Sequence, residues 1–361
     1  MNRTNSTVVD EHNADNAMPA DDLPPSWLTY LCGTLELLLA VGAIVGNAMF
    51  ILIVAFKKKL RSWMNVFLVN LSITDIIAAL FVSLPTTDAY YHRSWRFGAT
   101  FCLIHNLLHP ILVATSLWLT ACISMNRYIY IVHNKRYQQL TNKFTMTIAI
   151  TFVWVAPVLA QYRIYMDASL SSYAPSAFRC RKPEFNFFFI LFIYIPTAMV
   201  CVLYVPIIAF VINSRRRLRT HAAAEPHITT VRTGPTPQEV RMALVIFGVF
   251  CLVLLGYLPF AVIVNIYQLF GRRPPVEALL GAYPLQHIGG VLNPCLYGVN
   301  NRQFKDAYME LLTGKLIRCS IRLPANAVTP LTTRMEVGTS DNNLGLPSTS
   351  MDTSLETDRV L

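Results

Sequence analysis

The sequence predicts an all-α membrane protein: a bundle of seven transmembrane helices followed by a short amphipathic helix at the membrane interface. Of its 361 residues, 54% are hydrophobic and only 14% are charged, which is too apolar for an ordinary soluble protein of this length. Nearly charge-free stretches recur seven times along the chain. Each is long enough to cross a hydrocarbon core, which takes about 20 helical residues.

These seven stretches are the predicted spans, and short polar loops separate most of them. An odd number of crossings places the two termini on opposite sides of the membrane. The spans are Leu28–Phe56, Met64–Tyr90, Thr100–Ile131, Phe144–Tyr162, Phe185–Ser214, Met242–Phe270 and Ala278–Asn300.

Basic residues predict the orientation, because Lys and Arg gather in short cytoplasmic loops. They cluster at 57–61, 135–143, 215–241 and 302–322, after every second span. Of the 30 Lys and Arg, twenty lie on this side and nine on the other. We therefore expect a multi-pass plasma-membrane protein with an extracellular N-terminus and a cytoplasmic C-terminus. The net charge of +10 reflects this topology and does not predict a nucleic-acid partner.

Residues 1–27 form a polar arm that precedes the bundle of residues 28–300. The arm lacks the apolar region of a cleavable signal peptide, so the first span is expected to serve as the insertion signal. Asn2 and Asn5 begin glycosylation sequons, which are useful only if the arm is extracellular.

Residues 301–313 predict an amphipathic helix lying in the membrane interface, with apolar side chains on one face. These side chains are Phe304, Tyr308, Leu311 and Leu312. Cys319 follows closely and is a candidate for palmitoylation. Residues 320–361 are poor in aromatic residues and rich in Ser and Thr, which predicts a disordered tail. That tail is either a phosphorylation site or a polar segment without a specific role.

Two of the eight cysteines predict a disulfide bond. Cys102 opens the third span and Cys180 lies between the fourth and fifth spans, so both fall at extracellular ends. That compartment permits disulfides. We therefore expect Cys102 and Cys180 to be joined.

Polar residues inside the spans are candidate functional residues, because each costs several kcal/mol in hydrocarbon unless it faces the bundle interior. Asp75 lies in mid-span with no cation near it in sequence. It is therefore protonated, bound to a small cation, or hydrogen-bonded by neighbours such as Asn47, Ser116 and Asn293. The full set is Glu36, Asn47, Asn70, Asp75, His105, His109, Ser116, Arg127, His287 and Asn293.

The stretch "CISMNRYIYIVH" places a full positive charge, Arg127, at the end of the third span without an acidic neighbour. Three later spans contain prolines, namely Pro196, Pro259 and Pro294. Each proline removes one helical hydrogen bond and permits alternative bends. Together they indicate a bundle built to switch.

The sequence resembles the rhodopsin-like (class A) G-protein-coupled receptors over residues 28–319. The motifs that carry the resemblance are the outer cysteine pair, "NRY" at 126–128, and "NPCLY" at 293–297 followed by the amphipathic helix. Within that family, "NRYIYIVH" and "NPCLYG" are most similar to the melatonin-receptor branch.

The resemblance implies an extracellular ligand, a heterotrimeric G protein, and arrestin and a receptor kinase that act on the tail. Membrane lipid is expected to surround the helices. The resemblance implies that Arg127, between Asn126 and Tyr128, contacts the G protein. It also implies that Asp75 with Ser116 and Asn293 is the remnant of a sodium site, and we expect no other cofactor. The further switch positions are Tyr204, Tyr257, Pro259, Asn293, Pro294 and Tyr297.

The sequence also departs from the family pattern. Tyr257 stands where the family usually has tryptophan, and Val253 stands where a phenylalanine is expected. Gly289 and Gly290 replace one polar partner of the sodium site, which puts sodium binding in doubt. Higher basal activity is the hypothesis that follows.

The predicted pocket excludes two ligand classes. No lysine lies in any span, so a retinal Schiff base cannot form, and His109 stands where amine receptors hold a carboxylate. The outer loops are net positive, which favours a neutral or anionic small molecule or peptide. The candidate pocket residues are His109, Val113, Phe188, Phe192, Phe260, Tyr283 and His287. Glu36, His105, His109 and His287 form either a pH-sensitive or metal-binding cluster or a set of ordinary hydrogen bonds.

Arg127 needs a partner elsewhere in the bundle. Counting back twenty residues from Pro259 reaches Glu239, at the same depth on the sixth span, and predicts a resting ion pair with Arg127.

The rival function is a seven-span transporter or channel, although the two halves of the sequence show no internal repeat. The sequence contains nothing that resembles a membrane-embedded catalytic pair or metal motif, so we do not expect an enzyme.

Overall fold

The computed structural model describes residues 24–162, 172–174, 178–181, 190–224, 275–300 and 302–314, together with isolated positions at 166 and between 244 and 272. Most of the predicted sixth span, Met242–Phe270, therefore lies outside the described residues. So do the arm at 1–23 and the tail from 315 onward.

Six of the seven predicted spans are helical over nearly the expected residues, which confirms the all-α fold class. In the described part of the chain, five helical segments are long and apolar enough to cross a membrane. The main helices are α2 (Ser26–Phe56), α3 (Trp63–Ala78) continued by η3 (Ala79–Ser83) and α4 (Leu84–His92), α5 (Gly98–Val132), α7 (Lys143–Ala160), η7 (Ile190–Tyr194) continued by α9 (Ile195–Ala224), and α11 (Val276–Asn300). The predicted interfacial helix is α12 (Arg302–Leu312), and short helices η2 (Lys58–Leu60), η4 (Asn134–Arg136) and α6 (Tyr137–Leu140) lie in the loops.

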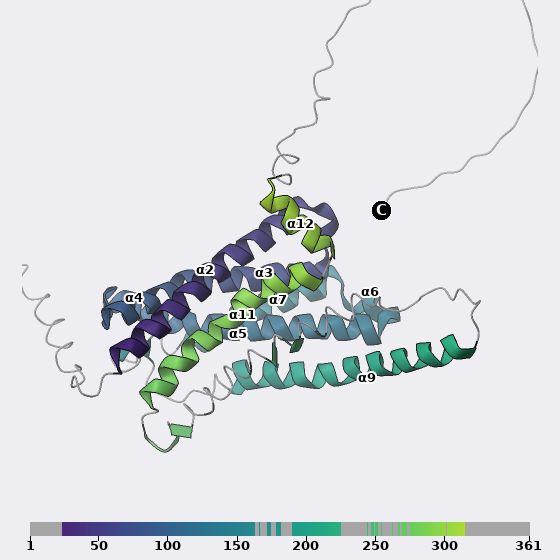
Figure 1. Cartoon of the computed structure of the whole chain (residues 1–361). Coiled ribbons are helices and arrows are strands. Elements are labelled where there is room, and N and C mark those ends of the chain that lie inside the picture. The colour runs from purple at the N-terminus through teal and green to yellow at the C-terminus, as the bar shows by residue number, and fades with distance from the viewer. Residues whose placement is uncertain are drawn as a thin grey trace, which may run out of the picture. The chain divides into compact units, whose positions relative to one another are not determined.

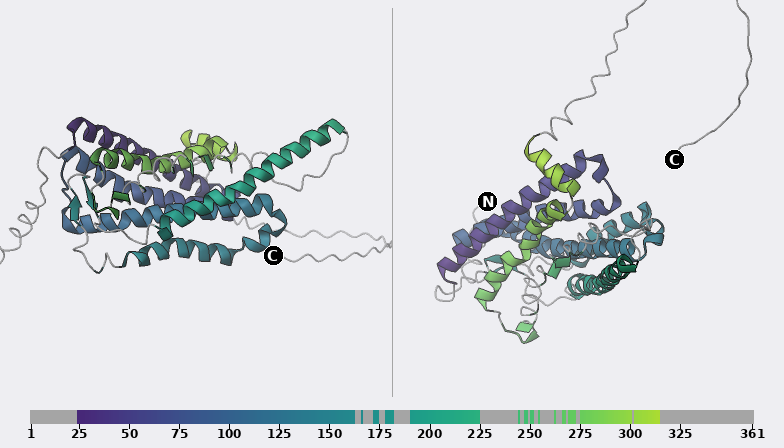
Figure 2. Two further views of the ribbon diagram at one scale, coloured as in Figure 1. Left: turned by 90° about the horizontal axis from the view of Figure 1, so that it is seen from below. Right: turned by 45° about the vertical axis from the view of Figure 1, so that its right-hand side comes forward.

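Two elements differ from the sequence-based expectations. The fifth helix continues to Ala224, ten residues past the predicted end at Ser214, and Figure 2 shows α9 extending beyond its neighbours. The extension is rich in Arg and Ala, which are strong helix formers, so the helix continues beyond its apolar segment. An antiparallel pair of short strands, β1 (Ser172–Ala174) and β2 (Arg179–Arg181), was not predicted.

The packing centres on α5, which lies against α3, α7 and α9, while α2 packs along α11 (Figure 1). Gly46 permits that second contact, because an added Cβ would lie 2.8 Å from Pro294 Cγ. Two π-helical turns, η3 and η7, immediately precede the helical turns that contain Pro85 and Pro196. A widened turn of this kind is a common answer to a proline that cannot donate its backbone hydrogen bond.

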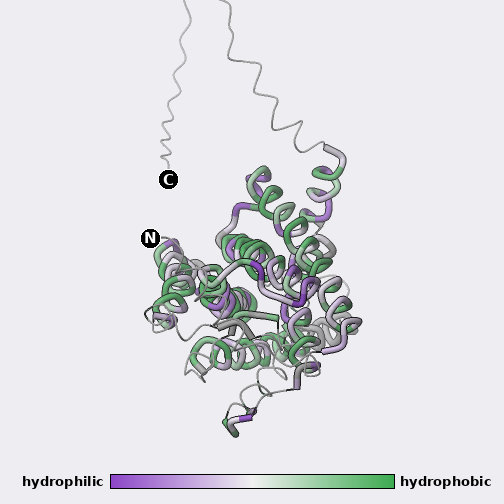
Figure 3. The backbone as a smooth tube through the Cα atoms, turned by 90° about the vertical axis from the view of Figure 1, so that its left-hand side faces the viewer, coloured by the Kyte–Doolittle hydropathy of each residue, from purple (hydrophilic) through white to green (hydrophobic). Residues whose placement is uncertain are grey.

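Apolar side chains both fill the bundle and cover it. Leu68, Leu119 and Val153 are fully buried between α3, α5 and α7. Leu38 and Val202, in contrast, are 66% and 69% exposed, and hydrophobic residues predominate along the helices in Figure 3. Apolar side chains on the outside of a helical bundle are expected where lipid is the solvent.

The bundle has two chemically different ends. We call the end that carries the turn at 57–62, the segment 133–143 and α12 the basic end. α12 is held there by stacking of Phe304 on Phe50 at 5.2 Å and by an ion pair between Glu310 and Lys57. We call the opposite end, where α4 ends and α5 begins, the disulfide end.

Candidate functional site in the bundle core

The predicted disulfide bond is present at the disulfide end. It joins Cys102, in the first turns of α5, to Cys180 on β2, with the two Cα atoms 5.3 Å apart. The bridge therefore ties β2 to the start of α5 at the disulfide end.

Arg127 lies near the basic end of α5 and is the largest fully buried side chain among the described residues, at 1% exposure. Its neighbour Asn126 accepts a hydrogen bond from the Tyr137 hydroxyl at 3.4 Å. Tyr128 contacts His133 at 3.0 Å, between the Tyr Oη and the His Nε2. Tyr137 on α6 was missed from the sequence, where a lone tyrosine in a loop carries no signal of its partner.

Tyr204, a predicted switch tyrosine, lies on α9 and is fully buried. Its ring stacks on Phe247 at 4.3 Å, and both pack in a cluster with Ile131 of α5. The cluster joins α5, α9 and three described positions of the predicted sixth span, Phe247, Phe250 and Leu254, near the Arg127 side chain. Movement of that span would therefore disturb the packing around Tyr204.

Asp75 is the centre of a polar core. Asn293 of α11 donates to its Oδ2 at 3.1 Å, and Ser116 of α5 makes a second side-chain hydrogen bond to the same carboxylate. Asn47, one of the candidate hydrogen-bond partners of Asp75, does not join this set: its amide donates to the carbonyls of Ala43 at 2.9 Å and Gly290 at 2.8 Å. Asn47 therefore braces α2 against α11.

The described side chains nearest Asp75 supply few oxygen ligands for a cation. Hard cations take oxygen ligands, but Asn293 turns its NH₂ group toward the carboxylate and Gly290 has no side chain to offer. Among the described residues, no group of three or more His, Cys, Asp or Glu is placed to hold a metal. Hydrogen bonding accounts for Asp75 in this arrangement, and sodium binding stays a prediction.

A close contact between an imidazole and a buried carboxylate lies nearer the disulfide end. His287 Nδ1 of α11 is 2.7 Å from Glu36 Oε1 of α2, and the Glu36 side chain is completely buried. The His109 ring of α5 lies 6.3 Å from the His287 ring. His105 lies apart, with its Nε2 3.2 Å from the Thr86 hydroxyl and its ring 5.1 Å from Trp95. Three of the four residues in the expected cluster thus come together.

A cavity of ≈ 90 Å³ connects the histidines with Asp75. Its walls come from α2, α3, η3, α5 and α11. Three predicted pocket residues, His109, Val113 and His287, line it. Phe192 packs instead beside Ala114, and Tyr283 lies further along α11 toward the disulfide end.

Gln286 is a lining residue that the sequence analysis did not single out. Within the part of the chain that the structure describes, neither its amide nitrogen nor its amide oxygen has a hydrogen-bond partner, and both atoms are buried. A buried amide left unsatisfied is costly, so a ligand or water that pairs with it gains stabilisation. The only available signal was a glutamine beside His287 in an apolar helix.

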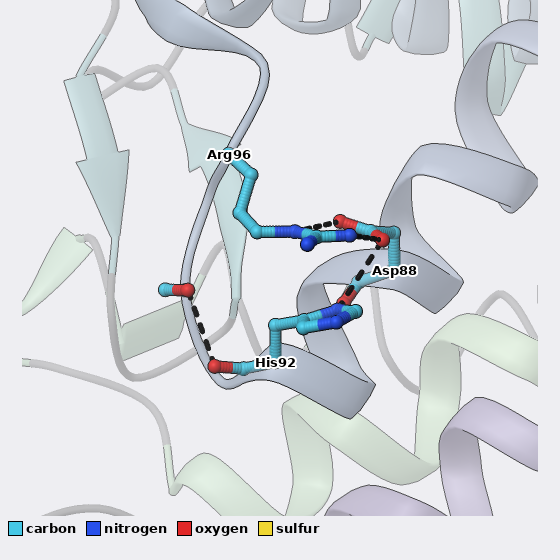
Figure 4. Close-up of polar contacts among 4 residues, drawn as sticks. Asp88, His92 and Arg96 are labelled. Carbon is cyan, nitrogen blue, oxygen red and sulfur yellow. Dashed lines mark hydrogen bonds and ion pairs between the residues drawn. The ribbon is translucent and has the colours of Figure 1, made fainter.

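Charges at the disulfide end partly neutralise each other (Figure 4). Arg96 Nε donates to Asp88 Oδ2 at 3.1 Å, and His92 Nδ1 lies 3.2 Å from the other oxygen. The hydrogen bond with Asp88 raises the pKa of the exposed Arg96 guanidinium. Arg96 is therefore a poor anchor for an anionic ligand, although it contributes to the net positive charge of the outer loops.

Several predicted residues cannot be placed. Those outside the described residues are Asn2, Asn5, Phe188, Glu239, Tyr257, Pro259, Phe260 and Cys319. Pro294 and Tyr297 lie in α11, where Pro294 is buried and accepts a hydrogen bond from Tyr308 at 3.4 Å.

The motifs and helices point to one receptor family, and the comparison with known proteins decides the matter. The family model of the 7 transmembrane receptor (rhodopsin family) matches residues 46–297. The chain belongs to this family. The receptor is 28% identical to melatonin receptor type 1A of Gallus gallus over 304 residues, which cover 81% of this chain and 84% of that one. It is 25% identical to melatonin receptor type 1B-B of Danio rerio over 299 residues, covering 80% and 83%.

Family membership settles several sequence-based predictions. The chain is a rhodopsin-like G-protein-coupled receptor and not an enzyme, and its relatives are multi-pass proteins of the plasma membrane. The alternative of a transporter or channel is set aside. The resemblance to the melatonin-receptor branch, which rested on two short motifs, agrees with the relatives found.

Proposed function

We propose that this receptor transmits the binding of an extracellular ligand at the disulfide end to a heterotrimeric G protein at the basic end. The concentration of Lys and Arg at 57–61 and 135–143 supports a cytoplasmic basic end, with the N-terminus extracellular and the C-terminus cytoplasmic. The disulfide bond between Cys102 and Cys180 fits an extracellular opposite end.

The observation that carries the proposal is the burial of Arg127 at the basic end of α5. A full charge in this position is costly, so it is kept where it performs a function. In the described arrangement Arg127 is too buried to reach a partner outside the bundle. Exposure of Arg127, with repacking of Tyr204 and Phe247, is the switch that a G protein would read.

The ligand proposed is a neutral or anionic small molecule or peptide that inserts a polar group beside His109, Gln286 and His287. The cavity there, ≈ 90 Å³, is smaller than a typical ligand site of about 300–1,000 Å³. It therefore receives one group of the ligand, while the remainder lies nearer the disulfide end. Because the relatives are named for melatonin, that neutral indole heads the candidates, followed by other indoles, lipids and short peptides.

The switch requires only a difference in affinity. A ligand that binds the active arrangement better than the resting one shifts the population by that difference, however the ligand is recognised. The flanking segments supply regulation: glycosylation at Asn2 and Asn5, palmitoylation at Cys319, and binding of arrestin and a receptor kinase to the tail at 320–361.

The test is G-protein activation in cells that express the full receptor, measured with sensors for each G-protein class. Arg127→Ala should abolish activation, whereas Lys305→Ala, which removes an exposed charge at the same end, should leave it intact. Arg127→Lys retains the positive charge at the buried position and is the control for a folding defect in Arg127→Ala. Signalling that survives Arg127→Ala at equal surface expression would overturn the proposal, as would ion flux without a G protein.

A further inference from the structure

A large groove opens at the basic end, away from the ligand cavity and Asp75. Its volume is ≈ 870 Å³. It lies between the turn after α2, the first turns of α3, and α6 with the turn that leads into α7. We call it the loop groove, and its lining residues are Val54, Arg61, Ser62, Val66, Val69, Tyr137, Thr141 and Asn142.

The loop groove has an apolar wall and a polar mouth. Three valines from α2 and α3, Val54, Val66 and Val69, make the wall. The mouth offers one guanidinium, from Arg61, with hydroxyl and amide groups around it. Arg61 is held in place because its guanidinium donates to the carbonyl of Ala55, at the end of α2. This division suits a ligand that is itself divided into a polar head and a hydrocarbon chain.

The charged residues in the two loop segments beside the mouth are all basic. Residues 57–62 and 133–143 contain seven Lys and Arg and no Asp or Glu. Lys57 is paired with Glu310, and the other six are exposed. Clusters of this kind at the inner surface attract anionic lipid headgroups, by about 1 kcal/mol for each cation. The six exposed cations are Lys58, Lys59, Arg61, Lys135, Arg136 and Lys143.

The groove also adjoins a surface suited to lipid chains. Phe56, at the end of α2, and Phe144, at the start of α7, are 40% and 74% exposed. Exposed aromatic side chains beside a cationic cluster are typical of the membrane interface. A soluble anion would use the cations but would leave the valine wall without an occupant.

We propose that the loop groove binds a phospholipid of the inner leaflet whose headgroup carries more than one negative charge. The phosphates lie at Arg61 and the surrounding loop cations, and one acyl chain runs along Val54, Val66 and Val69. The assignment of the lipid to the inner leaflet depends on the orientation proposed above. The binding of the lipid to the loop groove does not depend on it, because a nanodisc presents the same lipid to both ends of the receptor.

The test uses the full-length receptor, without G protein, in phosphatidylcholine nanodiscs that contain fluorescent phosphatidylinositol 4,5-bisphosphate at increasing fractions. Bound lipid is measured by energy transfer from a donor dye on the receptor. Arg61→Gln should weaken binding about five-fold, the equivalent of one cation. Val69→Phe, which fills the apolar wall without changing the charge, should also weaken it. Lys305→Gln, which removes an exposed cation on α12 outside the groove, should not.

Two results would overturn the proposal. Equal losses from Arg61→Gln and Lys305→Gln would show diffuse attraction to a charged surface. Complete displacement by soluble inositol trisphosphate, with Val69→Phe unaffected, would show an anion site that needs no lipid chain. Thermal unfolding midpoints close to that of the parent confirm that each variant is folded, and Val66→Phe replaces Val69→Phe if the latter is not.

Discussion

The hydroxyl of Tyr137 donates to the Oδ1 atom of Asn126, directly beside the buried Arg127. The bond joins α6, a short helix in a loop, to the end of α5. It therefore links the surface of the basic end with the residue that the proposed switch must release. Tyr137 also lines the loop groove, so lipid and switch share one side chain.

Tyr137→Phe should raise basal signalling. A single hydrogen bond contributes about 0.5–1.5 kcal/mol, so its loss shifts the ratio of resting to active receptor by up to about ten-fold. Basal G-protein activation at equal surface expression measures the effect. Tyr162→Phe, which removes an exposed hydroxyl at the disulfide end, is the matched control. A basal level unchanged from the parent would show that the Tyr137 bond does not restrain the switch.

Glu239→Ala should also raise basal signalling, because Glu239 is the predicted resting partner of Arg127 and Asn126 cannot neutralise it. Because Glu239 is the one acid expected to restrain Arg127, Glu239→Ala should raise basal signalling more than Tyr137→Phe does. The same basal assay applies, with Glu277→Ala, an exposed acid on α11, as the control. If both glutamate variants behave like the parent, the predicted ion pair is wrong.

How far the sequence predicts this molecule depends on the range of each interaction. Helices α2, α5 and α11 were predictable because a membrane span is a property of consecutive residues. The disulfide was predictable because only the bundle topology is needed to place Cys102 and Cys180 at one end.

Contacts between segments were harder. Asn47 was one candidate partner of Asp75. It bonds the carbonyl of Gly290 instead, because α11 approaches α2 closely at that glycine. Tyr137 and Gln286 carry no periodic signal, since each is a single polar residue whose importance comes from what packs around it.

Removing either Glu36 or His287 should destabilise the receptor, since taking one partner from a buried ion pair leaves the other charge uncompensated and costs about 3–5 kcal/mol when the imidazole is protonated. Glu36→Ala should therefore lower the thermal unfolding midpoint of the receptor in nanodiscs. His287→Ala should do the same. The unfolding midpoint of the double variant should fall by less than the sum of the two single decreases, because the interaction between the two side chains is removed only once. Strict additivity would mean that the two side chains do not stabilise each other.

Sodium should have little effect on this receptor. Asp75 receives hydrogen bonds from Asn293 and Ser116, and no side chain at Gly290 adds an oxygen ligand. Replacing sodium with a bulky organic cation at constant ionic strength should change ligand affinity and basal signalling less than about two-fold. A larger change that Asp75→Asn abolishes would establish a sodium site. A sodium-insensitive receptor with low basal signalling would contradict the hypothesis of elevated basal activity.

Gln286→Ala should reduce ligand potency about ten-fold or more without lowering surface expression. Both polar atoms of the Gln286 amide are buried at the cavity and lack a partner within the described residues, so a bound ligand supplies the missing hydrogen bonds. Each such bond contributes about 1 kcal/mol, and two of them account for a ten-fold change or more. Concentration–response curves for the most active compound of the ligand screen measure the shift. Gln139→Ala, an exposed glutamine at the basic end, is the control and should leave the curve unchanged. Because the Gln286 amide has no hydrogen-bond partner among the described residues, its replacement should leave the thermal unfolding midpoint of the free receptor unchanged or slightly higher. A lower midpoint with unchanged potency would make Gln286 a structural residue rather than a ligand contact.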